Sequence, residues 1–372
     1  ERVKLDSSNS LVEPEKTSST FVYLSTMKLS SVVLGVMAPS AVLADASWNF
    51  LVMGDWGGLP FIPYKSTAEV DTATGMGTVS AAENSSYVLA LGDNFYYSGV
   101  KSTDDARFKH TFEDVFKAPT LQGDDYFRVL LGNHDHLGST DAQIQYSNVS
   151  SRWRMDDLYW SYSESLPNGK TLDTFLIDTV TWAGEAHTVD AFGGVHSVHG
   201  DELPGPADQA AADAQLDWLE KGLEASTADY IIVAGHYPVY SICEHGPTSA
   251  LENLIPLLEK YQVSAYLNGH DHCQEYLDEG KGVQYHTIGS AQFNSADDSH
   301  RDAVPAGSLK WHVGLEDGHT GGFGRVTIDD DGLTVHHYAG NGTVVFTAPT
   351  VGPRNVSKTA RLHAEKTVWE RD

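Results

Sequence analysis

Five short apolar runs in this chain end in the same way, and this repetition constrains the fold more than any other feature. Each run leads into a glycine and then into an aspartate, an asparagine or a histidine. The runs are WNFLVMGD ending at Asp55, YVLALGD at Asp93, FRVLLGN at Asn133, DYIIVAGH at His236 and VSAYLNGH at His270. Such runs predict buried strands, and the longer polar or helical stretches between them predict a layered α/β or α+β fold.

The shared ending predicts a shared site. Glycine allows a sharp turn and a close approach of the backbone, and ligands of open α/β sheets gather outside the carboxyl ends of strands. With His272 of the GHDH stretch, the set has six donors. Carboxylate and amide oxygens combined with imidazoles suit iron, manganese or zinc better than a thiolate-type site. Six donors are too many for one ion with an open position, but they suit two ions that share a bridging carboxylate.

Tyr96 admits two interpretations from the residues alone. It lies in LALGDNFYYSGV, three residues after Asp93, at the end of an expected strand. It either packs in the core or provides a phenolate ligand to a metal. The composition of the run does not choose between them.

The charge balance excludes some partners. The 372 residues include 24 basic and 51 acidic side chains, a formal net charge of -27. A surface of this sign repels nucleic acid and anionic lipid, so neither is expected as a partner. A phosphorylated substrate is still allowed, because bound cations can reverse the local field.

The amino-terminal region predicts secretion. Met27 and Lys28 precede LSSVVLGVMAPSAVLA, which ends at Ala44. A short basic region, an apolar stretch too short to span a membrane and small residues at its end predict a signal peptide over 27–44. Residues 1–26 are an upstream segment of uncertain status. We expect no membrane association after cleavage, and a location outside the cell or in a lysosome-like or vacuole-like compartment. Four N-glycosylation sequons fit this expectation, at Asn84, Asn148, Asn341 and Asn355.

The series GDWGG, GDNFYYSGV, GNHDHLG, AGHYPVYS and NGHDH resembles the metallophosphoesterases, and within them the purple acid phosphatases. The likeness is greatest to their small, mammalian-like form, the tartrate-resistant acid phosphatases of type 5. It runs from about Ser47 to about Thr347 and includes AQIQYS, DTVTW, QLDWLEKGL and EHGPT. The resemblance implies a β-sandwich of two mixed sheets flanked by helices. It also implies one catalytic domain over 45–350, followed by a tail over 351–372.

The resemblance also implies a dinuclear centre, with a ferric ion and a divalent ion that is Fe(II), Zn(II) or Mn(II). The implied ligands of the ferric ion are Asp55, Asp93, Tyr96 and His272. The implied ligands of the divalent ion are Asp93, Asn133, His236 and His270. Asp93 would bridge the two, Tyr96 would be a phenolate whose charge transfer to iron gives the purple colour, and Tyr97 would pack.

The implied activity is acid hydrolysis of phosphate monoesters, with a metal-bound hydroxide attacking phosphorus. His134 and His245 are the candidates for protonating the leaving group, and the choice between them stays open. Asp135 and Asp271 are expected to orient site histidines. Other histidines match no ligand position and are expected outside the site: His136, His187, His196, His199, His336 and His337.

Two alternatives remain. The first is action on phosphodiesters, nucleotides or pyrophosphate, since one metal pair serves all of these. The second is a non-catalytic phosphate-binding protein, which would be expected to lack ligands. We expect a small phosphorylated substrate and a monomer.

Two segments depart from the implied relatives. Residues 183–209 are rich in glycine, proline and small side chains and predict a long exposed loop. Ala183 and Ala250 stand where such relatives carry a disulfide, which is therefore expected to be absent. Cys243 and Cys273 stand near expected ligands instead, and a bridge between them is one of two open possibilities.

Overall fold

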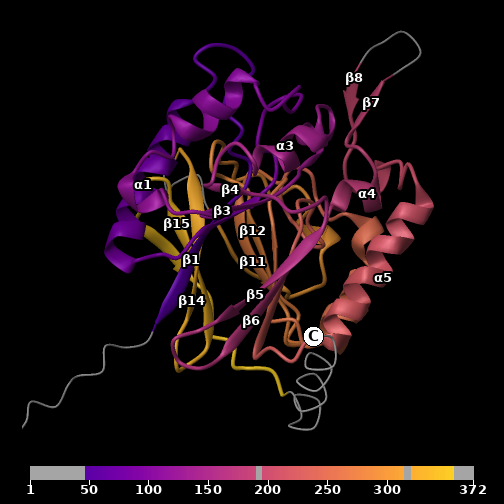
Figure 1. The fold of residues 1–372 in the computed structure, drawn as a ribbon. Coiled ribbons are helices and arrows are strands. Elements are labelled where there is room, and N and C mark those ends of the chain that lie inside the picture. Colours follow the sequence, from indigo (N-terminus) through magenta and orange to yellow (C-terminus); the bar gives the residue numbers. More distant parts are fainter. Residues whose placement is uncertain (1–46, 190–194, 314–319, 356–372) are drawn as a thin grey trace, which may run out of the picture. The chain divides into compact units, whose positions relative to one another are not determined.

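The computed structural model describes residues 47–189, 195–313 and 320–355, and two seven-stranded mixed sheets organise them (Figure 1). The first sheet has the order β16–β15–β14–β1–β2–β3–β4, and the second has the order β13–β11–β12–β10–β9–β6–β5. Strands of the first sheet are β1 (Trp48–Met53), β2 (Val88–Leu91), β3 (Phe127–Leu130), β4 (Trp153–Arg154), β14 (Gly322–Ile328), β15 (Leu333–Ala339) and β16 (Val344–Thr347). Strands of the second are β5 (Trp160–Ser165), β6 (Thr171–Leu176), β9 (Tyr230–Ala234), β10 (Ala265–Asn268), β11 (Gln274–Asp278), β12 (Gln284–Ile288) and β13 (Leu309–His312).

Helices cover the outer faces of both sheets. Figure 1 shows α1 outside the first sheet and α5 outside the second. The α-helices are α1 (Thr67–Glu83), α2 (Asn133–His136), α3 (Thr140–Tyr146), α4 (Thr179–Ala183), α5 (Gln209–Ala225) and α6 (Leu254–Lys260). The short helices are η1 (Phe108–Glu113), η2 (Pro119–Leu121), η3 (Gly200–Glu202), η4 (Ser249–Leu251) and η5 (Arg301–Ala303). The predicted fold class, two mixed sheets flanked by helices, is confirmed.

Alternation along the strands explains the layering. In β1, Phe50 and Val52 belong to a buried cluster that also contains side chains of β9 and β10. Leu51 and Met53 point the other way and pack in a second cluster with α1. In β9, the odd and even residues divide in the same manner between the central cluster and the cluster under α5. Both faces of the central strands are therefore buried, which is why their sequences are continuously apolar.

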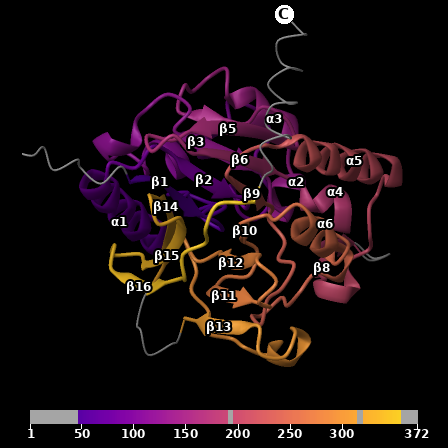
Figure 2. The same cartoon turned by 90° about the horizontal axis from the view of Figure 1, so that it is seen from below.

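Strand direction brings the predicted site together. β1, β2 and β3 are parallel neighbours, and β6, β9 and β10 are parallel neighbours in the other sheet. Figure 2 shows these strands from below, with β9 beside β10 and β1 beside β2. Because parallel strands end at the same edge, the segments that follow β1, β2, β3, β9 and β10 meet at one end of the sandwich.

The segment 183–209 differs from the expected loop. It contains a two-stranded antiparallel hairpin, β7 (His187–Val189) paired with β8 (Val195–Ser197), and then η3. Residue His187 lies opposite Ser197 in this hairpin. The sequence predicted a loop because the segment is rich in glycine and proline. The two strands are only three residues long, too short to show as a pattern in the sequence.

The ends of the catalytic domain differ in part from expectation. Residues at the start of the expected tail still pair with the domain, since the Val351 and Leu333 backbones exchange two hydrogen bonds of 2.8 and 2.9 Å. The expected signal peptide, the upstream segment and residues 356–372 lie outside the described residues. Within the described part of the chain, no helix is both long and apolar enough to cross a membrane. All four sequon asparagines are exposed.

Candidate metal centre

Three of the predicted iron ligands form a tight triangle of donor atoms. The Tyr96 hydroxyl donates to Asp55 Oδ1 at 3.1 Å and lies 3.2 Å from His272 Nε2. His272 Nε2 lies 3.6 Å from Asp55 Oδ1. Asp55 and Tyr96 are fully buried. Three donor atoms separated by 3.1 to 3.6 Å can all face one ion.

The predicted ligands of the second ion surround Asn133. Its Oδ1 lies 3.1 Å from His236 Nε2 and 3.1 Å from His270 Nδ1. His236 Nε2 is also 3.4 Å from Asp93 Oδ1. Ligand atoms of Asp55, Asp93 and His236 all lie within 4.8 Å of one another, so Asp93 stands where it can serve both groups. The seven residues named from the sequence thus converge.

Three of the predicted ligands have a strained backbone conformation. Asp55, Asp93 and His270 have φ of 60°, 49° and 70°, in the left-handed region that residues with a side chain rarely adopt. Such conformations persist where the surrounding structure enforces them, and they cluster at functional sites. The turn that each strand makes after its glycine therefore serves to aim the next side chain.

Hydrogen bonds fix the orientation of the donors. His236 Nδ1 donates to the Leu91 carbonyl at 2.8 Å, which turns Nε2 toward Asn133 and Asp93. The His270 N–H donates to Asp55 Oδ2 at 2.9 Å. A Cβ at Gly132 would overlap Asp93 Oδ1, so only glycine lets the backbone pass this close to the carboxylate.

Two buried carboxyls with opposite electrostatics lie at the centre. Burial raises the pKa of Asp55 well above its ordinary value, and the Asp93 charge adds to this. Burial would also raise the pKa of Asp93, but the imidazoles of His236 and His134 outweigh burial and lower it. The same interaction opposes burial at His236 and raises its pKa to about 9. A further positive charge at this point would favour the ionised form of Asp55 beside that of Asp93.

The pKa of Tyr96 is shifted by burial and by the same two carboxyls. Burial, followed by the Asp55 and Asp93 charges, raises its pKa well above the ordinary value. Burial also lowers the pKa of His272 to about 3, which keeps this imidazole neutral and able to act as a ligand. Buried carboxyls, neutral imidazoles and a phenol aimed at one point are the donor set that hard metal cations bind. The residues present therefore fit a dinuclear centre.

The two candidate proton donors lie at the edge of the centre. His134 Nδ1 donates to the Tyr97 carbonyl at 2.8 Å, and its Nε2 is 3.8 Å from Asp93 Oδ2. His245 Nδ1 is 3.1 Å from the His270 carbonyl. Both rings are thus anchored through Nδ1, which leaves Nε2 for a substrate. Tyr97, which we expected to pack, is 51% exposed beside His134.

Asp271 and Asp135 act differently from each other. Asp271 accepts the backbone N–H of His245 at 2.6 Å, and its Oδ1 lies 3.3 Å from Nδ1 of the His245 ring, where it can orient that ring. Burial lowers the pKa of His245, but the hydrogen bond and charge of Asp271 outweigh it, and the net shift is upward.

Asp135 does not bond a site histidine. Its carboxylate accepts from the N–H groups of Gly132, Asn94 and Phe95 at 2.9, 3.0 and 3.2 Å. It therefore fixes the backbone between Asp93 and Tyr96 and positions those ligands indirectly. The expectation that it orients a histidine was wrong, because a side chain next to a histidine in sequence points away from it on the short helix α2.

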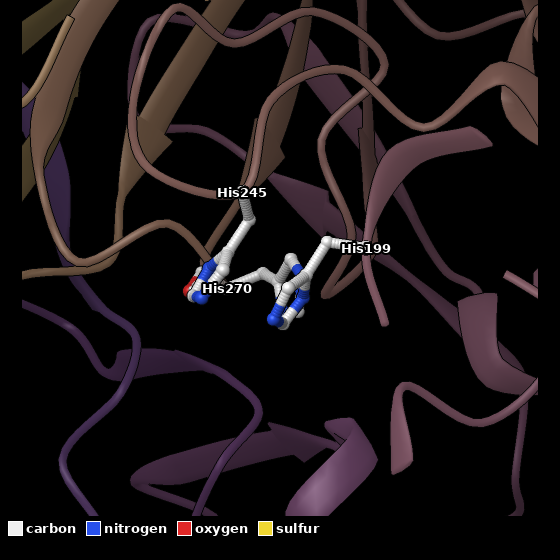
Figure 3. A group of neighbouring side chains, drawn as sticks. All are labelled: His199, His245 and His270. Atoms are coloured by element: carbon white, nitrogen blue, oxygen red, sulfur yellow. Dashed lines mark hydrogen bonds between the residues drawn. The ribbon is translucent and has the colours of Figure 1, made fainter. Parts of the chain in front are cut away.

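His187 and His199 belong to the site, contrary to expectation, and Figure 3 shows His199 beside His245 and His270. The His199 ring centroid lies 3.9 Å from that of His245 and 5.5 Å from that of His270. The His187 ring lies 4.6 Å from the His134 ring. The sequence did not indicate either residue as a site residue, because neither follows an apolar run that ends in glycine. The one signal was the presence of three histidines within residues 187–199.

Of the remaining histidines, His136 pairs with Asp178 at 3.0 Å, His336 bonds Thr347 and His337 bonds His286. These partners are side chains other than the seven predicted ligands. The His196 side chain is outside the described atoms.

The two cysteines are bonded. Cys243 and Cys273 form a disulfide with a Cα–Cα distance of 6.7 Å, and both are fully buried. Cys273 follows the ligand candidate His272, and Cys243 lies two residues before His245. The bridge therefore joins the segment after β9 to the start of β11, beside the centre.

Comparisons with known proteins agree with this geometry. Residues 49–274 match the sequence profile of the calcineurin-like phosphoesterases. Tartrate-resistant acid phosphatase type 5 of Oryctolagus cuniculus is 39% identical over 84% of this chain and 93% of its own length. Purple acid phosphatase 17 of Arabidopsis thaliana is 35% identical over 66% of this chain and 69% of its own. Among solved structures, GAP50, the anchor in the inner membrane complex of Plasmodium, shares the fold with a TM-score of 0.69 at 19% identity; the match covers 86% of this chain and 94% of GAP50.

The chain therefore belongs to the calcineurin-like phosphoesterases and, within them, to the tartrate-resistant, purple acid phosphatase branch. It is an enzyme of the phosphoester-hydrolysing class. The likeness to GAP50, at its low identity, supports only the fold.

Proposed function

We propose that this protein is an acid phosphatase that hydrolyses phosphate monoesters at a dinuclear centre of Fe(III) and a divalent ion, Fe(II), Zn(II) or Mn(II). The observation that carries the proposal is the convergence of seven donor side chains from two sheets, several of them in strained backbone conformations. Asp55, Asp93, Tyr96 and His272 would hold the ferric ion. Asp93, Asn133, His236 and His270 would hold the divalent ion.

When bound, the metal pair supplies activation of the attacking water and neutralisation of the phosphoryl charge. The chain itself supplies the buried, rigid positions of the donors and the proton for the leaving group. His245 is the better placed of the two proton donors, because Asp271 favours its protonated form while Nε2 remains free for the substrate. His134, anchored on Tyr97 and close to Asp93, would hold a phosphate oxygen on the opposite side.

The test is steady-state kinetics of the mature chain, from residue 45, after reconstitution with iron and each divalent metal in turn. We expect hydrolysis of p-nitrophenyl phosphate with an acidic optimum and at least tenfold lower kcat/KM for bis-p-nitrophenyl phosphate and pyrophosphate. Asp93→Asn and His236→Ala should each lower kcat by about a thousandfold, because a metal pair contributes several kcal/mol to the reaction. Asp173→Asn is the matched control, since this carboxylate bonds serine hydroxyls at a distance from the centre.

Either of two results would contradict the proposal. A protein that binds metal but hydrolyses no phosphate ester would be a binding protein. A protein that prefers diesters or pyrophosphate would be a phosphoesterase of different specificity.

We also propose that the enzyme works along the secretory pathway, outside the cell or in a lysosome-like or vacuole-like compartment. The buried disulfide and the four exposed sequon asparagines support this, because disulfides persist in oxidising compartments. A mobility shift of the secreted protein after glycosidase treatment would test it, and an unglycosylated cytosolic product would contradict it.

A further inference from the structure

The hairpin segment, residues 183–209 with β7 and β8, places two histidines against the candidate site. His199 follows β8 and stacks on His245 at 3.9 Å between centroids, with 31° between the ring planes, while His187 of β7 lies against His134. Each candidate proton donor therefore has a hairpin histidine beside it. Among the described residues, His199 Nδ1 is buried without a hydrogen-bond partner. A buried nitrogen of this kind has an unused capacity to bond a ligand.

A cavity opens between His199 and the disulfide-linked segment. It has a volume of about 380 Å³, and its lining includes His199, Glu202, Glu244, His245 and His300. Because it shares His245 with the candidate centre, a phosphate ester held at the metals would direct its alcohol portion toward this space. The volume lies in the range of small-molecule pockets.

Histidines aside, the charged groups that line the cavity are all acidic. Glu202 and Glu244 line it, and no lysine or arginine does so. Neither glutamate has an ion-pair partner within the described ranges, and the arginine next to His300, Arg301, is paired with Asp298 at 2.8 Å. Two carboxylates without a lysine or arginine partner among the described residues, placed near the leaving group, repel a second anionic group on the substrate and attract a cationic one.

We propose that this cavity is the leaving-group subsite of the phosphatase, that His199 is its specificity-determining residue, and that it accepts neutral or cationic alcohols in preference to anionic ones. The inference rests on the proposed function and narrows it. It assigns the hairpin a part in substrate choice, through a hydrogen bond from His199 to the alcohol and through the field of Glu202 and Glu244.

The experiment compares kcat/KM of the metal-reconstituted chain for four alkyl phosphates. Phosphoethanolamine, glycerol 1-phosphate and 3-phosphoglycerate have cationic, neutral and anionic leaving groups. Methyl phosphate has a leaving group too small to reach the cavity. For the wild type, we expect 3-phosphoglycerate to be about tenfold poorer than glycerol 1-phosphate, with the gap narrowing at high salt because the charges are exposed.

Variants separate the two contributions. Glu202→Gln and Glu244→Gln should each reduce the tenfold gap to about threefold, whereas Glu224→Gln, an equal charge change on exposed α5, should leave it intact. His199→Ala should lower kcat/KM for glycerol 1-phosphate about fivefold relative to methyl phosphate, and His199→Gln should restore part of this ratio by keeping a hydrogen-bonding group. A purely structural role of His199 would lower all four rates together.

The failures of the two proposals can be told apart. If the wild type hydrolyses all four esters equally, or if Glu224→Gln has the same effect as Glu202→Gln and Glu244→Gln, the subsite is wrong and the phosphatase function stands. If no phosphate ester, including p-nitrophenyl phosphate, is hydrolysed, the proposed function fails and this inference fails with it.

Discussion

Replacing Asp271 with asparagine tests whether the Asp271 carboxylate keeps His245 protonated, as a proton donor must be. The Asp271 carboxylate accepts the backbone N–H of His245 at 2.6 Å, and its Oδ1 lies 3.3 Å from Nδ1 of the His245 imidazole. Asparagine keeps the size of the side chain and one acceptor oxygen but removes the negative charge. His245 then loses the interaction that raises its pKa, while the burial that lowers its pKa remains.

The size and direction of the effect follow from these contacts. A hydrogen bond to a charged group contributes about 1.5–3 kcal/mol, which corresponds to about 10- to 150-fold in rate when it is lost. A histidine is protonated below its pKa, and a donor must be protonated. Raising the pKa therefore extends activity to higher pH, and the variant should lose activity at a lower pH than the wild type does.

The assay is the pH profile of kcat/KM with two substrates. An alkyl phosphate needs a proton on its leaving oxygen, so we expect a loss of about 10- to 150-fold at pH 6. p-Nitrophenyl phosphate releases a stable phenolate, so its loss should be several times smaller. Asp173→Asn, a remote change of the same kind, should alter neither profile. Equal losses for both substrates, or an unchanged basic limb, would refute the role of Asp271 and His245.

Three further changes probe the scaffold. His136→Gln breaks the ion pair with buried Asp178 and should destabilise the protein by about 1–3 kcal/mol in chemical denaturation at pH 5.5. Burial lowers the pKa of His136, but the charge and hydrogen bond of Asp178 outweigh burial, and the net shift is upward. The loss of stability in the variant should therefore shrink as the pH rises through the raised pKa of His136. A loss of stability that does not change with pH would contradict this. Cys243→Ser together with Cys273→Ser opens a bridge across 30 residues and should cost about 3–4 kcal/mol by loop entropy, and an unchanged denaturation midpoint would contradict this. Gly132→Ala would push a methyl group into the Asp93 carboxylate and should lower the bound metal per chain, measured by mass spectrometry, whereas full metal content would contradict the close approach.

The site could be predicted from the sequence where local pattern and topology act together. Apolar runs that end in glycine predict parallel strands, and parallel strands place Asp55, Asp93 and Asn133 at one edge without knowledge of side-chain contacts. The fold class could be inferred for the same reason. Five of the seven ligands come two residues after the end of a strand or closely behind it, whereas the role of Tyr96 was implied only by the resemblance.

The rest depended on contacts between distant segments. His199 reaches His245 only because a short hairpin pairs across glycine-rich sequence, and pairing of three-residue strands leaves little trace in the pattern. Asp135 stands beside a histidine in sequence, but α2 turns it toward the backbone of Asn94 and Phe95. Side-chain direction on a short helix is set by packing, which the sequence pattern does not encode.

The central claim is that Tyr96 and six further residues hold an iron-containing metal pair. The visible absorption spectrum of the iron-reconstituted chain, recorded beside that of Tyr96→Phe, tests it most directly. The account predicts a broad visible band in the wild type that is lost in the variant, because only the phenolate can transfer charge to ferric iron there. A wild type that binds two metals and hydrolyses phosphate esters without such a band would contradict the assignment of Tyr96.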